Sequence, residues 1–182
     1  MSYHRISIVL PVYNQADHIA EIVREYESAL ARVPLPHESL LVPNACRDNS
    51  AAVCRELAEM FPAVRVIESE LGGWGRAVKT GLRCAEGDLL CYTNSARTAA
   101  PDLVLLLLYA IAYPDTVIKA NRRVRESLGR RLGSRLYNLE CRALFRLTQG
   151  DINGTPKVFP RRFTALLQLC RDDDLIDAEF NV

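Results

Sequence analysis

Short apolar runs alternate with longer amphipathic stretches along most of the chain. The apolar runs have the length and aliphatic composition of strands, and they cover residues 6–10, 40–42, 64–67, 89–92 and 116–118. The stretches between them predict helices that end near Ala31, Met60 and Ala85, and a further helix after Pro101. Parallel neighbouring strands need such helical crossovers. We therefore expect an α/β fold, a mainly parallel sheet with helices on both faces.

The loops after the first four predicted strands are where function is expected. Ligands of open parallel sheets bind beyond the carboxyl ends of the strands. The loops that follow Leu10, Val42, Ile67 and Tyr92 should therefore meet at one site.

The composition is that of an ordinary globular domain. Of the 182 residues 49% are apolar, and 23 Lys and Arg stand against 22 Asp and Glu. This balance excludes a disordered chain and a polyanion-binding tail, so we expect no nucleic-acid partner. The six cysteines form no C-x-x-C pair, and we expect neither a zinc site nor disulfides.

The apolar segments also bear on location. The N-terminus lacks the apolar core of a signal peptide, which favours a cytoplasmic protein. The longest apolar run, Leu103 to Tyr113, is about half of the ~20 residues that a membrane-spanning helix needs. It predicts a buried core helix.

The last third of the chain has a different pattern. Residues 121–146 form an arginine-rich helical stretch, followed by a turn-rich loop at 150–156 and a short helix near 163–169. The chain ends in residues 177–182, which read as the start of a helix. We expect one domain over residues 1–182, with a C-terminal part beyond Val182 as an open alternative.

The first two candidate loops carry side chains suited to a nucleoside. Pro11 and Tyr13 follow the first strand, and the Tyr13 ring could stack on a base; the alternative is that this loop only shapes a turn and caps the core. Asn44 and Asp48 follow the second strand and could bond a base edge or a ribose. Helix capping by Asp48 or Ser50 is the structural alternative.

The third loop carries glycines and cations. Gly72, Gly73 and Gly75 permit close backbone approach at a helix start, and Arg76 and Lys79 follow, which suits a phosphate or diphosphate. The spacing matches neither the dinucleotide fingerprint nor the P-loop, and the dinucleotide glycines normally follow the first strand. A dinucleotide-dependent oxidoreductase is therefore the weakest of the alternatives.

Six segments together resemble the family-two inverting glycosyltransferases, especially the polyprenyl-phosphate (dolichol-phosphate) mannose or glucose synthases. In order, they are residues 6–14 (ISIVLPVYN), 40–50 (LLVPNACRDNS), 72–82 (GGWGRAVKTGL), 87–103 (GDLLCYTNSARTAAPDL), 134–138 (SRLYN) and 151–161 (DINGTPKVFPR). The resemblance implies the Rossmann-like GT-A fold and a transferase that moves a sugar from a UDP- or GDP-linked donor to an acceptor such as a polyprenyl phosphate. By analogy, it also implies association with the cytoplasmic face of a membrane.

This chain departs from the family's pattern at the positions that hold the metal ion. The family's leading Asp-Asp pair corresponds to Pro43 and Asn44, while its trailing aspartate is kept as Asp48. The Asp-x-Asp that holds a divalent metal falls on Asn94, Ser95 and Ala96. Because Mg²⁺ and Mn²⁺ prefer anionic oxygens, we predict no metal ligand set, although the family makes either ion a conceivable cofactor.

Cations of the protein are then needed to neutralise the leaving diphosphate. Arg76, Lys79 and Arg97 are the candidates near the donor. The resemblance places further phosphate-contacting groups, with Arg131 assigned to catalysis and the others to the acceptor phosphate: Arg122, Arg123, Arg131, Arg135 and Lys157. For at least half of the arginines at 122–146, a solvated helix face is the alternative.

A general base depends on the acceptor. A lipid phosphate is already anionic near neutral pH, so positioning and electrostatics would supply most of the catalysis. A sugar hydroxyl would need a carboxylate within reach, and Asp151 and Glu179 are the candidates, with loop and helix-cap roles as alternatives. The missing metal carboxylates also support a second hypothesis, a GT-A-fold binding or regulatory module without catalysis.

Overall fold

A computed structural model of the chain describes residues 3–121, 137–140, 142–144 and 151–182, and the side chain of Arg97 lies outside the described part. Its strands are β1 (Ile6–Val12), β2 (His37–Pro43), β3 (Val64–Val66), β4 (Leu89–Tyr92), β5 (Ile118–Lys119) and β6 (Lys157–Pro160). Its helices are α1 (Ile19–Leu30), α2 (Ser50–Met60), α3 (Trp74–Cys84), α4 (Ala100–Ala112) and α6 (Ile176–Glu179), with 3-10 turns η1 (Ser95–Arg97) and η2 (Thr164–Leu167).

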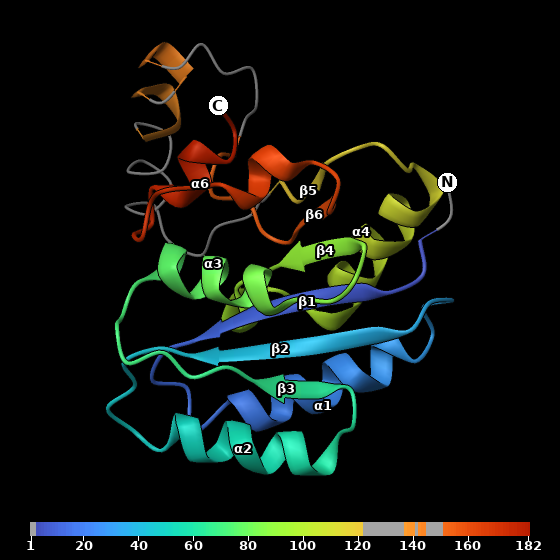
Figure 1. Cartoon of the computed structure of the whole chain (residues 1–182), viewed down its shortest axis with the longest axis vertical. Coiled ribbons are helices and arrows are strands. Elements are labelled where there is room, and N and C mark those ends of the chain that lie inside the picture. Colours follow the sequence, from blue (N-terminus) through green and yellow to red (C-terminus); the bar gives the residue numbers. More distant parts are fainter. Residues whose placement is uncertain (1–2, 122–136, 141, 145–150) are drawn as a thin grey trace.

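The sheet confirms the predicted α/β class. Its order is β3-β2-β1-β4-β6-β5, and β3, β2, β1 and β4 run parallel, as the strand-helix alternation predicted. Strand β6 pairs antiparallel with β4, and β5 pairs antiparallel with β6. This antiparallel edge was not predicted, because β6 reaches the sheet after the long segment that follows β5 (Figure 1).

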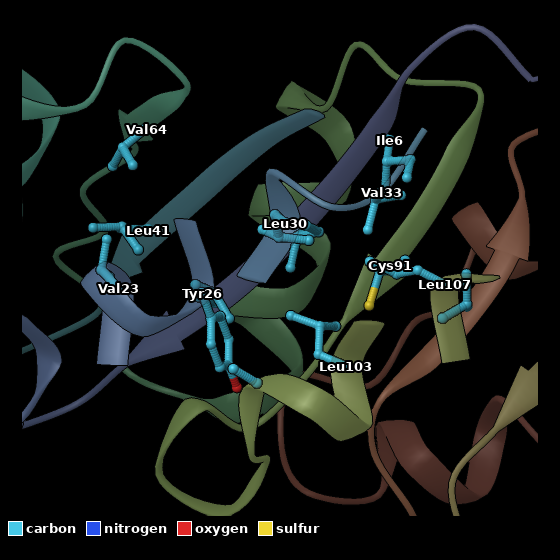
Figure 2. Packing of buried hydrophobic residues seen from close by; sticks show 14 of the residues in the cluster. Ile6, Val23, Tyr26, Leu30, Val33, Leu41, Val64, Cys91, Leu103 and Leu107 are labelled. Atoms are coloured by element: carbon cyan, nitrogen blue, oxygen red, sulfur yellow. The ribbon is translucent and has the colours of Figure 1, made fainter. Parts of the chain in front are cut away.

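Two apolar layers enclose the sheet. Alternate side chains of a strand point to opposite faces, so Ile8 of β1 joins a core with α1, α2 and α4 while Val9 joins a core with α3 and α6. Figure 2 shows the first layer, in which Tyr26 and Leu30 of α1 lie near Leu103 of α4. Burial on both faces explains why the central strands read as continuous apolar runs.

Helix α4 is only partly the buried core helix that its sequence predicted. It buries Leu103, Leu107 and Ala110 against the sheet, but Leu105 is 50% and Tyr109 51% exposed. Apolar composition all round the helix concealed the boundary between its two faces. Across the described ranges, no helix has both the length and the apolarity that a bilayer span requires.

Candidate functional site

A pocket of about 520 Å³ opens at the carboxyl edge of the parallel strands, within the usual size range of small-molecule sites. We call it the edge pocket. It is lined by Pro11, Tyr13, Gln15, Asn44, Ala45, Arg47, Gly72, Gly73, Trp74, Asn94 and Asp174. The structure thus brings together the loops after β1, β2, β3 and β4, which the sequence placed at one site.

Two aromatic side chains form part of the pocket wall. Tyr13 is 52% exposed, so its ring is available to a ligand. Trp74, the first residue of α3, sets its ring edge-on to the buried Tyr92 at a centroid distance of 6.5 Å. An exposed aromatic ring in a pocket wall offers a flat apolar surface on which a base can stack.

Asn44 holds three loops together at the floor of the pocket. Its Nδ2 donates to the carbonyl oxygens of Val12 at 2.8 Å and Val42 at 3.3 Å, and its Oδ1 accepts from the N–H of Gly73 at 3.2 Å. A carboxylate could not make the two donations, which gives a structural reason for an amide at this position. The donors of Asn44 are therefore directed to backbone rather than to a ligand.

Asp48 joins the first two loops and does not line the edge pocket. Its Oδ1 accepts from the N–H and hydroxyl of Ser50, at 3.0 and 2.5 Å, and its Oδ2 accepts from the N–H of Ala16 at 3.0 Å. These hydrogen bonds, that of the Ser50 hydroxyl first, lower the pKa of Asp48. Asp48 thus accepts the N–H of the first residue of α2, while the N-cap of that helix is Asn49, which makes no side-chain cap hydrogen bond. The predicted contact of Asp48 with a nucleoside stays a prediction.

One of the three residues at the position of the family's metal motif lines the same pocket. Asn94 lines it, and its Oδ1 is buried without a hydrogen-bond partner among the described residues. The hydroxyl of Ser95 donates to Gln15 Oε1 at 2.9 Å, and Ala96 has no side-chain oxygen. In the described ranges, no group of three or more His, Cys, Asp or Glu could hold a metal ion. These neutral oxygens do not fit a site for a hard divalent cation.

The cations of α3 lie in a second pocket. Arg76 and Lys79, predicted beside a donor diphosphate, line a cavity of about 530 Å³ that shares no lining residue with the edge pocket. Arg76 Nη2 lies 2.5 Å and Lys79 Nζ 2.6 Å from the carboxylate oxygens of Asp172. The hydrogen bond from Lys79, the largest cause, lowers the pKa of Asp172. Of the described residues that line the edge pocket, Arg47 is the one that carries a positive charge.

The glycine-rich turn does permit the predicted close backbone approach, but to the chain's own segment 170–174. A Cβ on Gly75 would lie 2.5 Å from the carbonyl oxygen of Arg171, and one on Gly73, at φ 135°, 2.5 Å from that of Asp172. The N–H of Arg76 donates to the same Asp172 carbonyl at 3.0 Å. The segment also carries Asp174 into the wall of the edge pocket.

Lys157 is placed differently from its prediction as a phosphate ligand. Its side chain is 0% exposed, its ammonium pairs with Asp177, and it lies 5.2 Å from the ring centroids of Tyr92 and Phe180. Burial lowers the pKa of Lys157 to about 8, against the opposing effect of Asp177. The ammonium is thus enclosed by the protein's own side chains in this arrangement, and the role of Lys157 as a phosphate ligand stays a prediction.

The structure describes only some of the remaining predicted site residues. Asp151 is buried and lies outside the edge-pocket lining, while both Glu179 oxygens accept backbone N–H groups, from Cys170 and Arg171. Their roles as bases stay predictions. The following lie outside the described residues or, for Arg97, have an undescribed side chain: Arg97, Arg122, Arg123, Arg131 and Arg135.

Sequence reasoning missed Gln15, Arg47 and Asp174 as pocket residues. Gln15 and Arg47 sit in the very loops that were singled out, so a wider choice within each loop would have found them. Asp174 is distant in sequence, and no local pattern connects its segment to the glycine turn.

Comparison with known proteins gives consistent matches. The sequence profile described as Glycosyl transferase family 2 matches residues 7–168. An undecaprenyl-phosphate 4-deoxy-4-formamido-L-arabinose transferase of Pseudomonas fluorescens (strain Pf0-1) is 27% identical over 172 residues, 93% of this chain and 51% of the relative. The same-named protein of Pseudomonas aeruginosa (strain LESB58) is 27% identical over 170 residues, 92% of this chain and 50% of the relative. The chain thus spans about half the length of these curated relatives.

Solved structures agree on the fold. Glucosyl-3-phosphoglycerate synthase from Mycobacterium tuberculosis, in complex with UDP, has a TM-score of 0.71 at 16% identity, covering 97% of this chain and 64% of that one. A mannosyltransferase from Pyrobaculum calidifontis, in complex with GDP-Man and Mn²⁺, has a TM-score of 0.58 at 20% identity, covering 97% and 51%. The predicted GT-A fold is confirmed.

Proposed function

The chain belongs to glycosyl transferase family 2, and from that membership we propose that its edge pocket binds the donor of an inverting sugar transferase. The donor is a nucleoside diphosphate sugar, linked to UDP or GDP. The single-domain organisation of residues 1–182 is part of the same proposal.

The observation that carries the proposal is the composition of the edge pocket. The exposed aromatic ring of Tyr13, one cation (Arg47), the carboxylate of Asp174 and neutral hydrogen-bonding groups meet where four loops converge. The Tyr13 ring stacks on the base, and the Arg47 guanidinium contacts the diphosphate, because a guanidinium binds phosphate oxygens in bidentate fashion. The Asp174 carboxylate would repel the diphosphate, so it is left for the hydroxyls of the ribose or the sugar. The neutral amide of Asn94 is assigned to the same hydroxyls.

Arginines take the place of the divalent metal in this proposal. The leaving nucleoside diphosphate takes the electron pair of the bond to the sugar's anomeric carbon, and its growing negative charge needs a cation beside it. Arg47 supplies that charge at the pocket, and Arg97, whose backbone belongs to η1 after β4, is a second candidate. In this proposal the pocket therefore needs no Mn²⁺ of the kind that the mannosyltransferase structure contains.

The acceptor is proposed to be a polyprenyl phosphate. The curated relatives are named for transfer to undecaprenyl phosphate. Its phosphate oxygen is anionic near neutral pH and attacks the anomeric carbon from the face opposite the leaving group, without a general base. An acceptor of this kind places the protein at the cytoplasmic surface of a membrane. The proposal concerns the whole protein, of which the chain corresponds to about half the length of these relatives.

A binding module without catalysis is the second candidate, and the absence of carboxylates at 94–96 favours it. Calorimetric titration of UDP- and GDP-sugars, with Mn²⁺ and with EDTA, tests both candidates when turnover on undecaprenyl phosphate is followed in parallel. Binding with turnover supports the transferase, and binding without turnover supports the module. Absence of binding under all of these conditions would overturn both.

A further inference from the structure

The second pocket has features of an anion site. We call it the α3 pocket, and it is lined by Ser69, Glu70, Leu71, Arg76, Lys79, Thr80, Arg83 and Asp172. Arg76, Lys79 and Arg83 lie three, four and seven positions apart on α3, so they share one side of the helix along its length. Three cations thus gather along a cavity of about 530 Å³ that Thr80 also lines.

An acidic side chain of the protein already occupies part of this cation cluster. The two Asp172 carboxylate oxygens contact Arg76 and Lys79 at 2.5 and 2.6 Å, so Asp172 holds the position that two oxygens of a phosphate would take. Asp172 is also partly exposed, with 45% of its side chain open to solvent. Its ion pairs are therefore open to competition by a soluble anion.

We propose that the α3 pocket is a binding site for a phosphate monoester or inorganic phosphate, which takes the place of the Asp172 carboxylate between Arg76 and Lys79 and gains Arg83 as a third cation. A doubly charged phosphate offers more oxygens than a carboxylate, and this allows it to compete with an internal side chain. The site does not depend on the nature of the ligand in the edge pocket.

A ligand in the α3 pocket affects the edge pocket through segment 170–174, which contacts both pockets. Asp172 ties this segment to α3, and Asp174 of the same segment lines the edge pocket. Trp74, the single tryptophan of the chain, lies at the start of α3 and lines the edge pocket. Its fluorescence therefore reports displacement of Asp172 with no nucleotide present.

Titration of the full chain with inorganic phosphate tests the site, with heat and Trp74 fluorescence as readouts and chloride at matched ionic strength as the control. We expect saturable binding that Asp172→Asn tightens about tenfold, because the substitution removes both a like charge and an internal competitor. Arg83→Gln should weaken binding at least severalfold, because it removes the third cation. It leaves the Asp172 contacts with Arg76 and Lys79 in place. Arg24→Gln, the same change on the exposed side of α1, should leave binding unchanged.

A second experiment with lipid vesicles distinguishes a soluble phosphate from a lipid headgroup as the ligand. Binding of free phosphate indicates a soluble ligand, whereas sedimentation with vesicles containing phosphatidic acid, and not with phosphatidylcholine alone, indicates a lipid headgroup. Either result supports the site when Arg83→Gln reduces it and Arg24→Gln does not. Lack of saturable binding in both arms, or an equal loss in Arg24→Gln, would overturn the proposal.

Two further controls keep the test decisive. Arg47→Gln should retain phosphate binding, and its loss there would assign the phosphate to the edge pocket and overturn the proposal. If Asp172→Asn does not fold, as judged by circular dichroism, the comparison of Arg83→Gln with Arg24→Gln decides the matter alone. Because no nucleotide is used, failure of the donor-binding proposal leaves this result unaffected, and the reverse is also true.

Discussion

The side-chain oxygen of Asn44 accepts the backbone N–H of Gly73 at 3.2 Å, and this bond ties the end of β2 to the start of α3. The amide group of Asn44 at the same time donates to two strand-end carbonyls. One buried side chain thus fixes the spacing of three loops that form the edge pocket.

Asn44→Asp should destabilise the protein by about 2–3 kcal/mol, because a carboxylate cannot donate to the Val12 and Val42 carbonyls and would bury a charge beside them. Urea unfolding at neutral pH measures the change. The matched control is Asn14→Asp, where the exposed side chain only accepts a hydrogen bond, from the N–H of Arg47, so a carboxylate can replace it. Equal stability of the two variants would contradict this account of Asn44.

Tyr13→Ala should weaken binding of UDP or GDP about tenfold or more, since stacking of a base on an aromatic ring is worth about 1–3 kcal/mol. Tyr13→Phe keeps the ring and should bind like the wild type. Thermal unfolding should change little in either variant, because about half of Tyr13 is exposed (52%). Calorimetry on both variants tests this, and an equal loss in Tyr13→Phe would mean that the hydroxyl, not the ring, is recognised.

Arg47→Gln should reduce affinity for a nucleoside diphosphate about tenfold or more, because a charge-assisted hydrogen bond contributes about 1.5–3 kcal/mol. Affinity for the nucleoside alone should hardly change, which separates a phosphate contact from a general disturbance of the pocket. Arg47→Lys is the matched variant that keeps the charge and loses the bidentate geometry. A similar loss for nucleoside and diphosphate would refute the assignment of Arg47 to the phosphates.

The free energy of unfolding should depend on alkaline pH through the buried Lys157. The pKa of Lys157 is lowered by burial from 10.5 to about 8 in the folded protein. Between pH 8 and 10.5 the unfolded chain therefore binds more protons at this residue, and its contribution to the free energy of unfolding rises with pH, by about 1 kcal/mol per unit at most. Chemical denaturation across this window, in the wild type and in Lys157→Met/Asp177→Asn, measures the difference; a difference independent of pH would contradict the lowered pKa.

The sequence predicted the fold better than the site because the two depend on different kinds of information. Strands β1 and β4 and helices α2 and α3 are local apolar patterns with clear ends, and they appear within a few residues of the expected positions. The β6 pairing and the 170–174 segment depend on contacts between distant parts of the chain. Residue type shows that Arg76 and Lys157 are charged, but not that Asp172 and Asp177 already pair with them.

The metal motif can be tested by restoring it. Asn94→Asp with Ala96→Asp should create a Mn²⁺ site, since both positions then supply anionic oxygens and Asn94 already lines the edge pocket. In EDTA the double variant should be less stable than the wild type, because the Asn94 oxygen is buried and a charge there is unpaired. Mn²⁺ should raise its melting temperature and tighten UDP binding, while neither quantity should change in the wild type. An equal response of the wild-type protein to Mn²⁺ would show that other residues hold the ion, and the proposal that arginines take its place would fail.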